Sequence, residues 1–221
     1  MTRWSTFGRA VTEEMKAPWS GAVVSVQPRI RLLRSFDERS HSYHGYVLRI
    51  DGTCAGERGE VGIAVGRAAH AKHGFRVGME VSGLAVPVAN PDTETAGWYK
   101  ARRLKVLRGA EVEAAAGPPF HGVPPDLETY RERGHRRLDP RTYESRCATC
   151  MWGCRMPVGI ILDTWNPWRR RYRVETFCYG PKSCRFYRAG RERTVPAKDG
   201  LSYTEGDWVD ESATAHRGPD D

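Results

Sequence analysis

Five of the six cysteines lie in the C-terminal third of the chain, and their spacing is the strongest chemical signal in the sequence. Cys147, Cys150 and Cys154 form a first group, and Cys178 and Cys184 form a second group after 23 intervening residues. Two cysteines separated by two residues can direct both sulfurs at one ion, because the short turn between them keeps them on one side. The pattern therefore predicts a metal–thiolate site.

A tetrahedral site needs four of these five cysteines. We expect Cys147, Cys150, Cys178 and Cys184 to be the ligands, with Cys154 as the alternative, because Cys150 and Cys154 are close and a short turn supplies two ligands. Four thiolates suit Zn²⁺, which is our first expectation. A [4Fe–4S] cluster is the alternative, since clusters accept irregular spacings such as the five residues between Cys178 and Cys184.

The chain between the two groups must bring them together. Residues 156–165 and 172–179 have the composition of two strands joined by a basic turn, and such a hairpin would return the second group to the first. Gly153 is expected to adopt a positive φ in the tight turn after Cys150. In layout this segment resembles a zinc ribbon, with the difference that a ribbon's second pair usually repeats the two-residue spacing.

The turn of this hairpin combines arginines with aromatic residues. A hairpin tip cannot bury three consecutive arginines, and exposed guanidinium groups bind phosphate while aromatic rings stack on unpaired bases. A second mixture of this kind occurs near residue 100. The residues we expect to contact nucleic acid are Trp98, Lys100, Arg102, Trp168, Arg169, Arg170, Arg171 and Tyr172.

The N-terminal half reads as strands. We expect a helix over residues 1–19, then five strands within residues 20–109, with a turn at Asp51–Gly52 and a short helix over 68–73 ended by Gly74. Five strands with a helix between the third and fourth resemble the oligonucleotide/oligosaccharide-binding (OB) barrel, over roughly residues 20–108. The resemblance implies binding of single strands, sugars or proteins on one face. The fold class is thus mainly β with short helices, an OB-like barrel followed by a small cysteine–metal hairpin module.

Composition divides the rest of the chain. Residues 110–125, rich in Ala, Pro and Gly, read as a linker. Residues 126–200 form the metal module with its helical lead-in, in which Asp126 and Asp139 are helix caps. Residues 201–221 carry a net charge of −5 and are expected to be an acidic, extended tail anchored by Trp208.

The net charge of +8 favours a polyanionic partner. Residues 121–200, which hold the clustered cysteines, carry a net +8 of their own. No run approaches the roughly 18 apolar residues of a membrane helix. Residues 1–19 carry charges where a signal peptide would be apolar. We therefore expect a cytoplasmic protein without a membrane partner.

These features predict a non-enzymatic metal–thiolate protein that binds single-stranded nucleic acid through the barrel face and the basic hairpin. No nucleophile, phosphate-binding loop or acid–base pair of recognisable spacing is present. Two alternatives remain open. One is a [4Fe–4S] electron-transfer or redox-sensing protein that docks to a protein partner, and the other is an accessory subunit of a larger nucleic-acid-processing complex.

Overall fold

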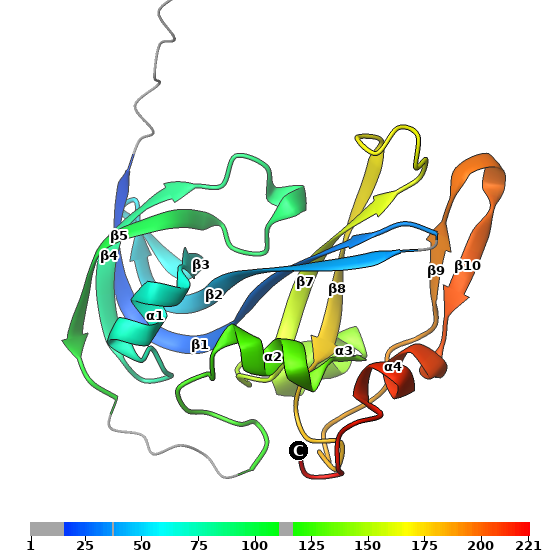
Figure 1. The fold of residues 1–221 in the computed structure, drawn as a ribbon. Helices are drawn as coiled ribbons and strands as arrows, with labels where there is room; N and C mark the ends of the chain where they lie inside the picture. The colour runs from blue at the N-terminus through cyan, green and yellow to red at the C-terminus, as the bar shows by residue number, and fades with distance from the viewer. Residues whose placement is uncertain (1–15, 37, 111–116) are drawn as a thin grey trace, which may run out of the picture.

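The computed structural model describes residues 16–36, 38–110 and 117–221. The protein is mainly β with short helices (Figure 1). The helix expected over residues 1–19 falls outside the described residues up to position 15. Residues 17–19, which are described, belong to the first strand.

Five strands form a closed ring. They are β1 (Ala17–Arg34), β2 (Arg39–Cys54), β3 (Glu57–Val65), β4 (Glu80–Pro87) and β5 (Trp98–Arg108). Their order in the sheet is β2-β3-β5-β4-β1, and β1 pairs again with β2 to close the ring. All neighbours are antiparallel except β3 and β5, which run parallel.

The helix predicted after the third strand is present. Helix α1 (Arg67–His73) joins β3 to β4 and ends at Gly74, whose φ of 55° lies in the left-handed region. A residue with a side chain is disfavoured there, so glycine is the natural helix terminator. A short 3₁₀ turn, η1 (Pro91–Thr93), lies in the loop between β4 and β5.

The turn expected at Asp51–Gly52 is wrong, because β2 continues through these residues to Cys54. The chain turns instead at Ala55 and Gly56, both with positive φ. Gly52 faces Gly21 of β1, and a Cβ on Gly52 would lie 2.1 Å from the carbonyl oxygen of Ser20. Glycine is thus required at this position by the close approach of two strands.

Strand β1 belongs to both halves of the molecule. The register of its pairing with β2 shifts between Arg29 and Ile30. Its last residues, Leu32–Arg34, then pair in parallel with Val158–Ile160 of β7 (Gly153–Ile161).

The C-terminal strands extend the same sheet. Strand β7 pairs with β8 (Arg170–Cys178), and β8 pairs with β6 (Arg136–Arg137), giving a sheet of eight strands. The cysteine hairpin is thus a continuation of the ring's sheet, whereas the sequence suggested a separate module after a linker.

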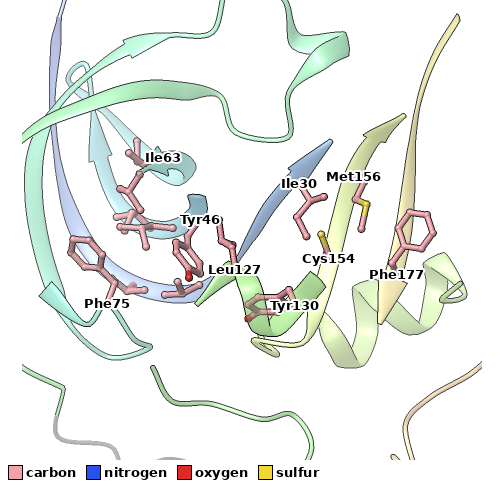
Figure 2. Packing of buried hydrophobic residues seen from close by; sticks show 14 of the residues in the cluster. Ile30, Tyr46, Ile63, Phe75, Leu127, Tyr130, Cys154, Met156 and Phe177 are labelled. Carbon is pink, nitrogen blue, oxygen red and sulfur yellow. The ribbon is translucent and has the colours of Figure 1, made fainter. Parts of the chain in front are cut away.

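One hydrophobic cluster fills the space between ring and hairpin (Figure 2). Phe75 lies at the ring end of the cluster, and Met156 and Phe177 lie at the hairpin end. Between them, α2 (Leu127–Arg133) contributes the buried side chains of Leu127 and Tyr130.

The two predicted helix caps are confirmed. The Asp126 carboxylate accepts a hydrogen bond from the Thr129 backbone N–H at 2.8 Å and begins α2. Asp139 does the same for Thr142 at the start of α3 (Pro140–Thr142), which leads into the π-helical turn η2 (Tyr143–Cys147). No helix in the described part of the chain has the length and apolar character needed to cross a bilayer.

Residues 201–221 are folded rather than extended. Strand β10 (Ser202–Glu205) pairs with β9 (Arg193–Pro196), and η3 (Lys198–Gly200) lies between them. Helix α4 (Asp207–Thr214) follows. Trp208 is 58% exposed and does not anchor this segment.

Buried charges fix this C-terminal segment. Glu205 contacts Arg34 at 2.8 Å, and Asp210 contacts Arg137 at 2.9 Å. Both arginine side chains are at most 2% exposed. Two of the acidic residues that suggested an extended tail are therefore partners of buried cations, a pairing that composition cannot reveal.

Candidate metal centre and basic hairpin tip

The four cysteines expected to be ligands line one cavity. Cys147 ends η2, Cys150 lies in the turn that follows, Cys178 ends β8, and Cys184 lies in the loop after β8. Strand pairing explains the convergence, because Cys178 lies opposite Gly153 at the base of the β7–β8 hairpin. The rest of the lining is largely apolar and includes Phe120, Trp152, Phe186 and Tyr187.

The first cysteine loop (residues 147–153) is a tight, hydrogen-bonded turn. The backbone N–H of Cys150 donates to the carbonyl of Cys147, and that of Gly153 donates to the carbonyl of Cys150, both at 3.0 Å. Gly153 does not have the positive φ that the sequence suggested. Glycine is needed there because a Cβ would lie 2.6 Å from the Cys147 carbonyl oxygen.

A glutamine of the ring holds this first loop. The buried Gln27 amide of β1 donates from Nε2 to the carbonyl oxygens of Cys147 at 3.0 Å and Cys150 at 2.9 Å. Its Oε1 accepts a hydrogen bond from the Tyr143 hydroxyl at 2.6 Å. Sequence analysis missed Gln27, since 120 residues separate it from Cys147 and only the fold joins them.

The C-terminal segment (residues 201–221) and Arg136 of β6 hold the second cysteine loop (residues 178–184). Arg217 donates to the carbonyl oxygen of Gly180 at 2.8 Å, and Arg136 donates to that of Pro181 at 2.9 Å. The Ser183 hydroxyl contacts the Asp220 carboxylate at 2.6 Å. The first cysteine loop is therefore attached to β1, and the second is attached to β6 and the C-terminal segment.

Backbone N–H groups point at two of the sulfurs. Gly180 donates to Cys178 Sγ at 3.4 Å. Burial raises the pKa of the Cys150 thiol, and backbone hydrogen bonds from Trp152 and Phe120 offset part of that rise. Such donors stabilise a thiolate, because hydrogen bonds to the charged form favour it.

Burial opposes ionisation of the same thiols. It raises the pKa of Cys147 to about 12, with further contributions from Cys178, Cys150 and Cys184. The pKa of Cys150 rises to about 11, again chiefly through burial. The buried thiols of Cys147, Cys150 and Cys178 thus keep their protons unless a cation offsets the charge of their thiolates.

The cavity between the cysteines is small. Its volume is about 10 Å³, close to the space of a single water-sized sphere. The sulfurs line this cavity without forming a complete ligand set, since within residues 16–36, 38–110 and 117–221 no three His, Cys, Asp or Glu side chains stand ready to hold an ion.

The two remaining cysteines lie elsewhere. Cys154 is completely buried in the main core beside Ile30, Met156 and Phe177 (Figure 2), and its thiol contacts the carbonyl oxygen of Pro28 at 3.4 Å. Cys54 is buried in the ring at the end of β2. Neither lines the cavity of the other four.

The tip of the β7–β8 hairpin projects into solvent, as the sequence predicted. Asp163 shapes the turn by accepting hydrogen bonds from the Trp165 backbone at 3.0 Å and the Asn166 amide at 2.8 Å. Trp168 is 72% exposed. The three arginines and Tyr172 that follow are also exposed.

The residues expected on β5 do not join this tip. Figure 1 shows β5 in the wall of the ring and the hairpin tip at another side of the molecule. Trp98 is half-buried against the main core, and Lys100 Nζ lies 4.9 Å from the centre of the Tyr99 ring. Arg102 is exposed. Only the resemblance to an OB barrel suggested that these residues share one surface with the hairpin tip.

Comparison with known proteins leaves function to be argued from geometry. No family model, curated protein or solved structure matches this chain.

Proposed function

We propose that this protein is a zinc–thiolate protein that binds single-stranded nucleic acid, with Cys147, Cys150, Cys178 and Cys184 as the zinc ligands. The observation that carries the metal assignment is the shared cavity of these four residues. They come from two loops far apart in sequence, and hydrogen-bond donors face two of the sulfurs. Thiol groups gathered in this way match the ligand set of a structural zinc site.

Cavity size favours zinc over an iron–sulfur cluster. A space of about 10 Å³ admits roughly one atom-sized occupant. A [4Fe–4S] cluster has eight core atoms and would force the two loops apart.

The proposed role of the ion is structural. Four thiolates fill the tetrahedral coordination of Zn²⁺ and leave no position for water or substrate. The ion would lock the first cysteine loop to the second and so fix the base of the β7–β8 hairpin. Metal binding of this kind contributes directly to folding stability.

The nucleic-acid proposal has two supports. First, the hairpin tip offers Arg169, Arg170 and Arg171 to solvent beside Trp168 and Tyr172, a combination suited to phosphates and unpaired bases. Second, we infer that the ring is an OB-type barrel, since its strand order and the helix between β3 and β4 match that topology. Barrels of this type bind single strands. A reducing cytoplasm would keep the thiols available for metal.

Elemental analysis of the purified protein tests the metal site. We expect about one zinc per chain, loss of zinc in Cys178→Ser, and retention in the matched variant Cys154→Ser, whose thiol is equally buried but does not line the cavity. Iron with inorganic sulfide would favour the redox alternative. Full zinc content in Cys178→Ser would refute the ligand assignment.

Binding of a labelled single-stranded oligonucleotide at several salt concentrations tests the second half of the proposal. Affinity that falls steeply with salt is expected from phosphate contacts. An isolated, zinc-loaded chain that binds no oligonucleotide would instead favour an accessory role within a larger complex.

A further inference from the structure

A pocket of about 390 Å³ opens between the ring and the first cysteine loop. One side is the outer surface of β1, β2 and β3, and the other side comprises Tyr143, Glu144 and Ala148. This pocket is distinct from the small cysteine cavity, and its volume lies within the range of ligand sites, roughly 300–1,000 Å³.

The ring side of the pocket is partly apolar. Pro28 of β1, Val47 of β2 and Val61 of β3 line it from three neighbouring strands. Val47 is half-buried and lies on the outward face of β2 beside Gly62, so it presents hydrocarbon to a ligand, whereas the side chain of Val61 packs against the main core. Beside them, the buried Ser25 hydroxyl lines the pocket and has no hydrogen-bond partner among the described residues.

Charges inside the pocket are already balanced. Arg49 contacts the Glu60 carboxylate at 2.9 and 2.8 Å and also donates to the carbonyl oxygen of Ala148 at 3.1 Å. The interior therefore offers no spare cation for an anionic group. Arg155 also lines the pocket, is exposed, and has no ion pair within the described parts of the chain.

We propose that this pocket holds one unstacked base of the bound single strand, while Arg155 contacts the neighbouring phosphate. A base is flat, largely apolar on its faces and polar at its edge, which matches an aliphatic surface with a free hydroxyl. The inference rests on the proposed nucleic-acid function and adds a specific site to it.

The metal would shape this pocket. The loop that carries Cys147 and Cys150 is the pocket's wall, and Gln27 and Arg49 fasten that loop to the ring. Zinc binding, by fixing the same loop from its other side, would hold the wall in the position that a base requires.

Filling the pocket tests the proposal. The zinc-loaded full chain is titrated with a fluorescent single-stranded DNA of about 12 nucleotides, a length within the range that one OB fold covers. Val47→Phe should reduce affinity at least about tenfold, because the added ring occupies the space of the base. The matched variant Val123→Phe, at an exposed valine that does not line the pocket, should bind as the native chain does.

The outcomes separate this inference from the proposed function. Native affinity in Val47→Phe, with zinc content unchanged, would overturn the base pocket and leave the hairpin as the binding site. Absence of binding by the native chain would overturn the nucleic-acid function itself. If Val47→Phe does not fold, Thr95→Phe fills the same pocket from the loop before β5, and unchanged affinity there would equally refute the proposal.

Discussion

The arginines of this protein occupy two contrasting regions. At the hairpin tip, Arg169, Arg170 and Arg171 are exposed, and no ion pair to them occurs in the described parts of the chain. At the junction of sheet and C-terminal segment, Arg34 and Arg137 are at most 2% exposed and bind carboxylates. The same side chain therefore serves as a free cation in one region and as internal structure in the other.

This contrast changes the meaning of the net charge. The charge of +8 and the acidic C-terminal segment together suggested a polyanionic partner and an extended acidic tail. Instead, Glu205, Asp207 and Asp210 of this segment pair with Arg34 and Arg137, whose buried side chains are not available to a polyanion. The positive field that a nucleic acid would meet comes from the unpaired arginines, so pairing rather than composition decides where binding can occur.

The largest effect is expected at the buried end. Arg137→Ala removes the partner of Asp210 and leaves its carboxylate buried without a cation, which costs about 3–5 kcal/mol of unfolding free energy. Urea denaturation measures this loss. A change below about 1 kcal/mol would show that the Arg137–Asp210 pair does not hold the C-terminal segment.

Acid should weaken the same region by a smaller amount. Burial, followed by the nearby charges of Arg39 and Arg34, lowers the pKa of His41 to about 4 in the folded protein, against 6.5 in the unfolded chain. Folding therefore favours the neutral form of His41. Its contribution to the free energy of unfolding is complete above pH 6.5 and is lost as the pH falls towards 4, which amounts to roughly 3 kcal/mol.

A comparison with His41→Leu isolates this effect from the carboxylates that also titrate in acid. The variant should lose less stability than the native chain between neutral pH and pH 4.5 in urea titrations. Identical pH profiles would mean that His41 takes up its proton in the folded state without penalty.

The buried amide of Gln27 is uncharged and provides a case between the buried and the exposed arginines. Gln27→Ala leaves the carbonyl oxygens of Cys147 and Cys150 and the Tyr143 hydroxyl without this partner, at a cost of about 1–3 kcal/mol. Zinc affinity, measured by competition with a chelator, should fall as well, because the first cysteine loop loses its attachment to the ring. Unaltered zinc affinity would show that the loop is set by its own turns.

The smallest effect on stability is expected at the exposed end. Replacing Arg169, Arg170 and Arg171 together with Ala should change the unfolding free energy by less than about 0.5 kcal/mol. The slope of oligonucleotide affinity against salt should decrease by about 2, since each phosphate contact to a single strand contributes about 0.7. An unchanged slope would remove the hairpin from the proposed interface.

Local patterns predicted much of this architecture. The helix stop at Gly74 and the caps at Asp126 and Asp139 were correct because each depends on a few neighbouring residues. The hairpin was foreseen from composition, although its strands are shifted along the chain. The turn predicted at Asp51–Gly52 was wrong, because Gly52 is required for the close approach of β2 to β1.

By itself the sequence determined the residue types that could hold a metal, the likeness of the N-terminal half to a closed five-stranded arrangement, and an exposed basic hairpin tip. These follow from spacing, alternation and the cost of burying charge. Only the tertiary structure decided that the hairpin extends the ring's sheet, that Gln27 fastens a loop 120 residues away, and that the acidic segment folds onto buried arginines. These three features depend on which groups, distant in sequence, are buried next to one another. A buried donor or charge is stable only beside a partner, and here the fold supplies that partner from a distant part of the sequence.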